Sequence, residues 1–358
     1  MTVIERSDVS CWMKELHKVI SPNFMRAEPR ERAWNYMCGL VGETAGSRRN
    51  IASYANERRA DGAQRLLTTA QWDENEVRAN LLDQVKTHFG VTQGCLYTTE
   101  VTFAKKGSAP VAVERQFSID NCRLENCQIA VLMFYVAPNG AFVFIDAVPY
   151  LPPSWLVDPG RRLKASIPPD IRYRTKSQIA TGMIERALEA GFDPKMAFFS
   201  LLCQDKMYLR HALQAKNIPY LMSLTSGEFE GLSGVEADDP RLESNAVTGR
   251  PLGKSFSGRL PLVEQCTARA PIGHRPPHSA YCCIGNHRAV SNAELNRTIA
   301  ELRRMEARLR SVRSEIRLDR YEVRSWRGWH RHMTLAMVVQ TAMELARQSP
   351  AEFKREAS

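Results

Sequence analysis

The chain has 358 residues, 44% of them hydrophobic, which suffices for about two or three domains of roughly 150 residues each with a buried core. Its formal net charge of +10 favours a polyanionic partner, most often nucleic acid. Nine cysteines without regular spacing, and no signal-peptide pattern before Glu5, predict a reducing, cytoplasmic location. No apolar run approaches the ~18 residues of a membrane span, so no membrane partner is expected.

Residues 1–90 are predicted to be helical. In Gln71–His88 and the residue after it, apolar side chains recur at spacings of three and four, and no strand pattern is evident in the region. Paired arginines such as Arg48 and Arg49 contact phosphates or lie on solvated helix faces, and the pattern leaves both open. The prediction is an all-α N-terminal domain with a role in DNA binding.

Short runs typical of strands begin near residue 94. They cover Cys95–Phe103, Cys127–Val136 and Ala141–Tyr150, and Pro138 to Gly140 predict a tight turn between the last two. This part of the chain is therefore predicted to form three consecutive strands, the last two as a hairpin.

Helices and strands alternate in the next segment. Lys176–Ala190 has helical periodicity and is followed by Gly191, a residue typical of the position after a helix end. The apolar run Met196–Leu202 predicts a buried strand, Asp205–Lys216 a helix, and Pro219–Leu224 a further strand.

A long helix is predicted near the C-terminus. Residues 225–275 are rich in Gly, Ser, Pro and charge and predict an insertion or loop. Structure resumes near Ser279, and a helix of about 25 residues begins at Ser291 or Asn292. The order β-β-β-α-β-α-β followed by a long helix predicts a ribonuclease-H-like α/β fold, a mixed sheet with flanking helices.

These elements divide the chain into five predicted parts. They are a helical domain at 1–90, the first part of the core at 91–224, the insertion at 225–278, the completion of the core with the long helix and a C-terminal helix at 279–347, and a tail at 348–358.

Several motifs resemble those of DDE transposases from the group named after insertion sequence 701. In family order these are Asp61–Leu67 with Ala70–Asp73, Phe103–Gly107, Glu125–Gln128, Tyr150–Trp155, Met183–Leu188 and the aromatic, arginine-rich and histidine-rich run Tyr321–Met337. The resemblance covers roughly residues 40–345. It implies a metal-dependent nuclease and strand transferase in which two Asp and one Glu hold two Mg²⁺ ions ~3.5–4 Å apart.

The resemblance places the first Asp of that triad at Thr99 and the second at Ser200. The Glu falls on Glu306, seven residues before a basic position occupied by Arg313. Both Asp positions therefore carry neutral hydroxyls. One carboxylate with two hydroxyls would hold Mg²⁺ weakly, so no cofactor is expected to bind well and the strand-transfer chemistry is expected to be lost.

Three neighbouring residues could substitute for the missing carboxylates or supply new chemistry. Glu100 follows Thr99, but consecutive strand residues point to opposite faces. Asp205 lies at a helix start, where an N-cap role is favoured. Cys203 would lie near Ser200. Two alternatives stay open: an unusual nuclease built on Glu100, Asp205 and Glu306, or an enzyme for a small-molecule substrate that uses Ser200, Cys203, Thr99 and Glu306.

Positive charge is concentrated in Arg303–Arg331, where ten arginines face four acidic residues, a local excess of six. This stripe predicts contacts to DNA phosphates. The predicted DNA-binding residues are Arg303, Arg304, Arg310, Arg313, Arg317, Arg324, Arg327, Arg331, Lys105 and Lys106. DNA is the expected partner, and a homodimer is left open.

A cluster of His and Cys residues has spacings that a Zn²⁺ site could use, namely His274, His278, Cys282, Cys283 and His287. The spacing is nonstandard, and the resemblance implies that Tyr281–Cys283 match an apolar strand of the family, where the two cysteines would be small core residues. No metal site is predicted from this cluster.

Overall fold

A mixed β-sheet forms the core of the protein. The computed structural model describes residues 6–41, 61–201, 205–224, 262–265, 281–285 and 292–348. Within them the sheet has eight strands, in the order β2-β3-β1-β5-β6-β8-β7, with β4 also paired to β3. The strands are β1 (Cys95–Ala104), β2 (Glu114–Ser118), β3 (Arg123–Val136), β4 (Phe142–Pro149), β5 (Met196–Ser200), β6 (Tyr220–Leu224), β7 (Leu262–Gln265) and β8 (Tyr281–Gly285).

Strand directions identify the fold. The central strand β1 is antiparallel to β3 and parallel to β5, β4 is antiparallel to β3, and β6 is parallel to β5. The prediction of a ribonuclease-H-like fold is confirmed by this arrangement. The long strand β3 pairs with two strands end to end, its first residues with β2 and Ala130–Val136 with β4.

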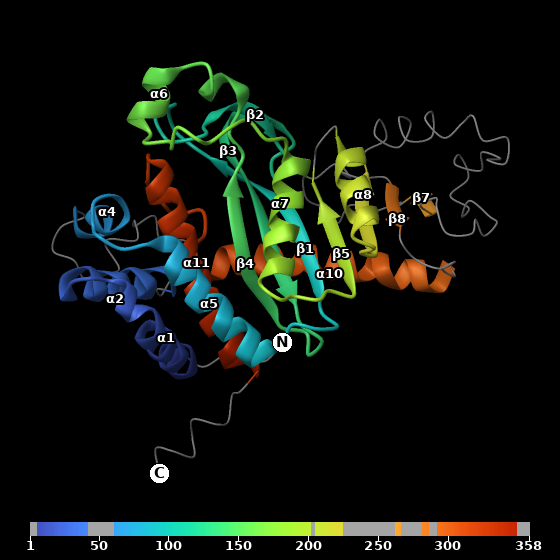
Figure 1. Cartoon of the computed structure of the whole chain (residues 1–358), viewed down its shortest axis with the longest axis horizontal. Helices are drawn as coiled ribbons and strands as arrows, with labels where there is room; N and C mark the ends of the chain where they lie inside the picture. Colours follow the sequence, from blue (N-terminus) through green and yellow to red (C-terminus); the bar gives the residue numbers. More distant parts are fainter. Residues whose placement is uncertain are drawn as a thin grey trace, which may run out of the picture.

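Helices cover both faces and one side of the sheet. They are α1 (Arg6–Ile20), α2 (Ala27–Val41), α4 (Asp61–Thr68), α5 (Glu74–Phe89), α6 (Pro159–Lys164), α7 (Lys176–Glu189), α8 (Lys206–Ala215), α10 (Asn292–Glu315) and α11 (Trp326–Gln348). In Figure 1, α7 lies in front of the sheet and α10 behind it, while α1, α2, α4 and α5 gather around α11 at one side. Among the described helices, none is long and apolar enough to cross a membrane.

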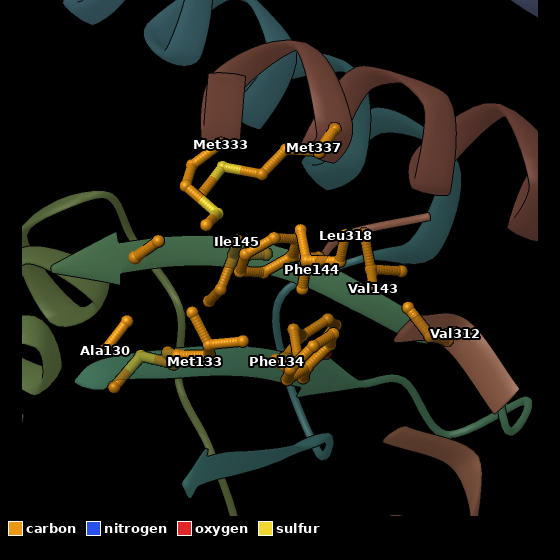
Figure 2. Packing of buried hydrophobic residues seen from close by; sticks show 14 of the residues in the cluster. Ala130, Met133, Phe134, Val143, Phe144, Ile145, Val312, Leu318, Met333 and Met337 are labelled. Carbon is orange, nitrogen blue, oxygen red and sulfur yellow. The ribbon is translucent and has the colours of Figure 1, made fainter. Parts of the chain in front are cut away.

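Helix α11 joins the N-terminal helices to the sheet. Nearly all of its residues from Gly328 to Ala346 are buried, and polar ones among them such as Arg331 and Gln340 have hydrogen-bond partners inside the protein. It contacts β4 on one side and α1, α2, α4 and α5 on the other. Figure 2 shows Met333 and Met337 pointing from α11 toward Phe144 and Ile145 of β4. The N-terminal helices and the sheet therefore share one continuous hydrophobic core.

Most predicted elements match the structure within a few residues. The turn before β4 is confirmed by the hydrogen bond from Gly140 N to Ala137 O and by the positive φ of Gly140. Gly191 follows α7 with φ +94°, as predicted. The prediction of a loop is wrong at Leu262–Gln265, which forms β7. The rest of residues 225–261 and 266–275 lies outside the described residues.

The edge strand β2 was not predicted from sequence. Its residues Glu114–Ser118 are mostly polar, and only Ser118 is buried. A short, half-exposed edge strand lacks the apolar pattern by which strands are recognised.

Candidate active site and basic surface

Thr99 and Ser200 lie side by side in the sheet. They are register partners in the parallel pair β1–β5, and Thr99 Oγ1 donates a hydrogen bond of 3.1 Å to the backbone oxygen of Ser200. Ser200 is the last residue of β5, so its side chain stands where the strand gives way to the following loop. Ends of neighbouring parallel strands are where α/β sheets commonly place functional groups.

Glu306 reaches the same point from α10. Ser200 Oγ donates a hydrogen bond of 3.0 Å to Glu306 Oε1. Glu306 is half-buried and lies beside the buried stripe of α10 that includes Leu302, Met305 and Leu309. Three elements far apart in sequence thus bring Thr99, Ser200 and Glu306 together.

Tyr97 is a fourth member of this group, and it was missed from sequence. It lies two residues before Thr99 on β1 and is fully buried. Burial raises the pKa of its hydroxyl, the charge of Glu306 raises this pKa further, and the hydroxyls of Thr99 and Ser200 oppose the rise. Because side chains two apart on a strand share a face, the period of the strand could have identified Tyr97.

Glu100 lies on the opposite face of β1. Its carboxylate accepts a hydrogen bond of 2.7 Å from Lys176 Nζ at the start of α7, and its side chain is fully buried. The strand therefore has no bulge that would turn Glu100 toward Thr99, since β1 keeps a continuous register with β3 and β5. Glu100 contributes an ion pair between the sheet and α7 instead.

Asp205 also points away from Glu306. It stands at the N-cap position of α8 but makes no side-chain cap there, contrary to the predicted role. Its carboxylate accepts a hydrogen bond of 2.5 Å from Thr175 Oγ1, and Thr175 caps α7. Cys203 lies outside the described residues. The structure therefore does not assemble the alternative set of Glu100, Asp205 and Glu306.

The assembled group does not fit a two-metal centre. It offers the carboxylate of Glu306 and the hydroxyls of Thr99 and Ser200, and the Ser200 hydroxyl directs its proton to that carboxylate. Two Mg²⁺ ions carry four positive charges, which such sites offset with several carboxylates. Within the described ranges, no group of three or more His, Cys, Asp or Glu residues could hold a metal ion. Of the predicted His and Cys cluster, His274, His278 and His287 lie outside those ranges.

Three of the predicted DNA-binding arginines are exposed on α10. They are Arg303, Arg304 and Arg310, and Arg310 lies one helical turn after Glu306. The charge of Arg310 also acts on Tyr97. Arg324, Arg327 and Lys106 are exposed elsewhere, and Arg317 is half-buried just after α10. Arg303 and Arg310, about one helical turn before and after Glu306, therefore border the group around it, whereas Arg304 lies on another side of the helix.

Arg313 and Lys105 have structural partners. Arg313 forms ion pairs with Asp120 at 2.8 Å and with Asp319 at 3.1 Å, and it donates a hydrogen bond of 3.1 Å to Thr102 O. Lys105 Nζ lies 3.4 Å from the ring centroid of Tyr321, and burial lowers its pKa to about 8. These cations fix the segment after α10 to β1, and in this arrangement they do not present their charges to a ligand.

Arg331 is buried between α11 and the N-terminal helices. Its guanidinium donates hydrogen bonds to Glu74, to Leu66 O and to Trp72 O, and it stacks 4.7 Å from the ring of Trp72. Only 2% of the residue is exposed. Because its guanidinium binds these partners inside the protein, the structure does not support the prediction that Arg331 contacts DNA.

His332 lies in the same interface between α11 and the N-terminal helices. Tyr36 of α2 donates a hydrogen bond of 2.7 Å to Nδ1, and Nε2 donates one of 3.2 Å to Leu318 O when the ring proton is on Nε2. Burial lowers the pKa of His332 to about 3 and that of the neighbouring His330 to about 4. The two histidines are therefore neutral. The run Tyr321–Met337, rich in aromatics, Arg and His, therefore forms the interface that docks α2, α4 and α5 onto the core.

The family described as "DDE superfamily endonuclease" matches residues 19–275. The matched span contains Thr99 and Ser200 and ends before α10. No curated protein matches the chain.

Proposed function

Since the match covers well over half of the chain, the chain belongs to the DDE superfamily of endonucleases, and we propose that it is a transposase-derived protein that binds DNA without strand transfer. Within that superfamily we assign it to the group named after insertion sequence 701. In this proposal Thr99 and Ser200 occupy the two Asp positions of the catalytic triad, and Glu306 is the remaining carboxylate.

The observation that carries the proposal is the convergence of Thr99, Ser200 and Glu306. Motif order alone assigned these three residues to the triad, and in the fold Thr99 Oγ1 donates a hydrogen bond to the backbone oxygen of Ser200, whose Oγ donates one to Glu306. Only Glu306 can carry a negative charge at neutral pH. A site with one carboxylate lacks the charge that would hold two Mg²⁺ ions and clamp both oxygens of a phosphoryl displacement.

The proposed DNA surface begins with Arg303, Arg304 and Arg310. These arginines are exposed on the same helix as Glu306, and Arg303 and Arg310 lie about one helical turn before and after it. We add Arg324, Arg327 and Lys106, which are also exposed. We leave Arg313 and Arg331 out, because their guanidiniums are engaged by partners within the protein.

Fluorescence anisotropy on random duplex DNA across a salt series tests this surface. We expect the triple change Arg303→Ala, Arg304→Ala and Arg310→Ala to weaken binding and to reduce the salt slope by about 0.9 for each DNA phosphate that is no longer neutralised. A matched control removes the same charge from exposed residues elsewhere: Lys14→Ala, Lys164→Ala and Lys195→Ala.

The control should keep the native slope. Equal reductions of affinity in both triple variants would show that net charge alone governs binding and would contradict an interface on α10. Absence of binding by the native protein near physiological salt would contradict DNA binding altogether.

A second candidate function is an enzyme for a small-molecule substrate. The hydrogen bond from Ser200 to Glu306 favours it, because a carboxylate in that position can accept the proton of a nucleophilic hydroxyl. A fluorophosphonate probe followed by peptide mapping tests it. Labelling of Ser200 that disappears in Glu306→Gln would support this candidate, whereas absence of labelling at Ser200 would count against it.

A further inference from the structure

Asp146 is held by two arginines from different helices. It lies on β4, and its carboxylate accepts hydrogen bonds from Arg78 Nη1 of α5 at 3.0 Å and from Arg186 Nε and Nη2 of α7 at 3.1 and 2.6 Å. The residue is 6% exposed. In Figure 1, β4 passes between α5 and α7, which lets one carboxylate bind both helices.

Arg174 brings a third guanidinium to this point. It precedes α7, and its Nη1 converges with Nη1 of Arg186 above Gly182, where a Cβ atom would lie 4.0 Å from the first nitrogen and 3.6 Å from the second. Arg174 makes no hydrogen bond or ion pair with any residue that the structure describes. Nη1 of Arg186 is also not used for Asp146.

Three guanidiniums share the one carboxylate of Asp146, and Glu74, whose charge also acts on Arg78, forms an ion pair with Arg331. Burial and then the charge of Arg186 lower the pKa of Arg174. At Arg78, burial again lowers the pKa, Asp146 opposes this, and Arg186 lowers the pKa further. In addition, Nε and Nη2 of Arg78 are buried without a hydrogen-bond partner among the described residues. The cluster thus has more cationic donors than acceptors.

Like charges that lie close together repel one another, so an anion bound between these guanidiniums is favourable. Guanidiniums bind phosphate oxygens through two parallel hydrogen bonds, so Arg is the preferred residue for oxyanions. Arg186 is suited to this role because Asp146 fixes two of its nitrogens and leaves the third directed toward Arg174. Its side chain is 46% exposed, which gives a ligand access from solvent.

We propose that Arg174 and Arg186 form a binding site for a phosphate-type oxyanion, with Asp146, itself anchored by Arg78, holding Arg186 in place. The site lies on the α7 face of the sheet. That face is opposite the Thr99 side chain, since Lys176 of α7 binds Glu100, the next residue on β1. The oxyanion site is therefore separate from the group around Glu306, and it does not depend on the function proposed for that group.

Thermal unfolding of the full chain in inorganic phosphate, compared with sodium chloride at equal ionic strength, tests the site. We expect phosphate to raise the Tm of the native protein saturably. Arg174→Gln should weaken the phosphate effect about tenfold or more. It should also raise the Tm in the absence of phosphate, because it removes repulsion between like charges.

Arg172→Gln is the matched control, since Arg172 is exposed two residues earlier and donates only to Pro169 O within the described chain. It should keep the native response. Equal Tm values of the native protein in phosphate and chloride would overturn the proposal, and so would native phosphate affinity in Arg174→Gln.

Binding of duplex DNA by the same variant separates two sources of the oxyanion. If the ligand is a backbone phosphate of DNA, Arg174→Gln reduces the salt slope by about one unit and inorganic phosphate competes with DNA. If the ligand is a free phosphate or a phosphorylated small molecule, Arg174→Gln loses the phosphate response and leaves DNA binding at the native level.

Discussion

Ser200 Oγ donates a 3.0 Å hydrogen bond to Glu306 Oε1, which joins the end of β5 to the middle of α10. An Asp in place of Ser200 would put two carboxylates within about the same distance, and at neutral pH they would repel each other unless a cation lay between them. A serine replaces that repulsion with a hydrogen bond. The arrangement is therefore stable without metal, which agrees with the proposal that the catalytic site has lost its ions.

Replacing Arg331 should destabilise the fold and leave DNA binding intact. Arg331→Ala leaves Glu74 and two backbone oxygens without their partner, and breaking a buried ion pair costs about 3–5 kcal/mol. Arg327→Ala, an exposed neighbour on the same helix, should change the free energy of unfolding by no more than about 0.5 kcal/mol. Urea unfolding measures both. Similar free energies for the two variants would contradict the docking role of Arg331.

Arg313 and Arg310 should separate structural from DNA-binding cations on α10. Arg313→Ala breaks ion pairs with Asp120 and Asp319, and hydrogen bonds between charged groups contribute about 1.5–3 kcal/mol. Arg310→Ala should leave stability nearly unchanged and weaken DNA binding instead. The check is to measure the unfolding free energy and the DNA affinity of both variants. A strongly destabilised Arg310→Ala beside a fully stable Arg313→Ala would contradict the assignment.

The elements of the core could be predicted because their patterns are local. The alternation of strands and helices, the turn at Gly140 and the helix end at Gly191 follow from neighbouring residues. The run of positive charge was a poorer guide to which arginines are exposed. Arg331 and Arg313 belong to the basic stripe, but their partners Glu74 and Asp120 lie far away in sequence. Exposure of an arginine depends on such distant contacts, and sequence spacing does not contain them.

The prediction of the candidate site rests on motif order, whereas that of the helices and strands rests on periodicity. Motif order placed Thr99, Ser200 and Glu306 together, although no periodicity links residues separated by about a hundred positions. Tyr97 was missed because an aromatic residue on a buried strand has the same pattern as an ordinary core residue. The cluster of Arg78, Arg174 and Arg186 was also missed, since its members come from separate elements that meet only at Asp146.

Stability should fall as the pH drops below about 6.5. Burial lowers the pKa of His332 to about 3 and that of His330 to about 4, whereas in the unfolded chain both should titrate near the ordinary value of about 6.5. Between pH 6.5 and these lowered pKa values, the unfolded state binds more protons than the folded state. The contribution of the two neutral histidines to the free energy of unfolding is therefore fully present above pH 6.5 and is lost on acidification. Each histidine contributes about 2 kcal/mol between pH 6.5 and 5.

Urea unfolding at pH 7 and pH 5 measures this loss. His330→Gln should lose less stability on acidification than the native protein, because one titrating group with a lowered pKa is gone. His211→Gln, a change at an exposed position on α8, should keep the native pH dependence. Identical pH dependence in all three proteins would contradict the assignment of His330 as a neutral group in the folded state.

Thr99 and Ser200 are proposed to occupy two former metal-binding positions, and thermal unfolding in a Mg²⁺ titration tests this proposal. We compare the native protein with the double variant Thr99→Asp and Ser200→Asp. The native Tm should not respond to Mg²⁺ beyond the effect of ionic strength. The double variant should unfold at a lower temperature without metal, because three carboxylates then repel one another. At a Mg²⁺ concentration a hundredfold above Kd, bound Mg²⁺ should increase the free energy of unfolding of this variant by about 2.7 kcal/mol. Saturable stabilisation of the native protein by Mg²⁺, or no response in the double variant, would contradict the account.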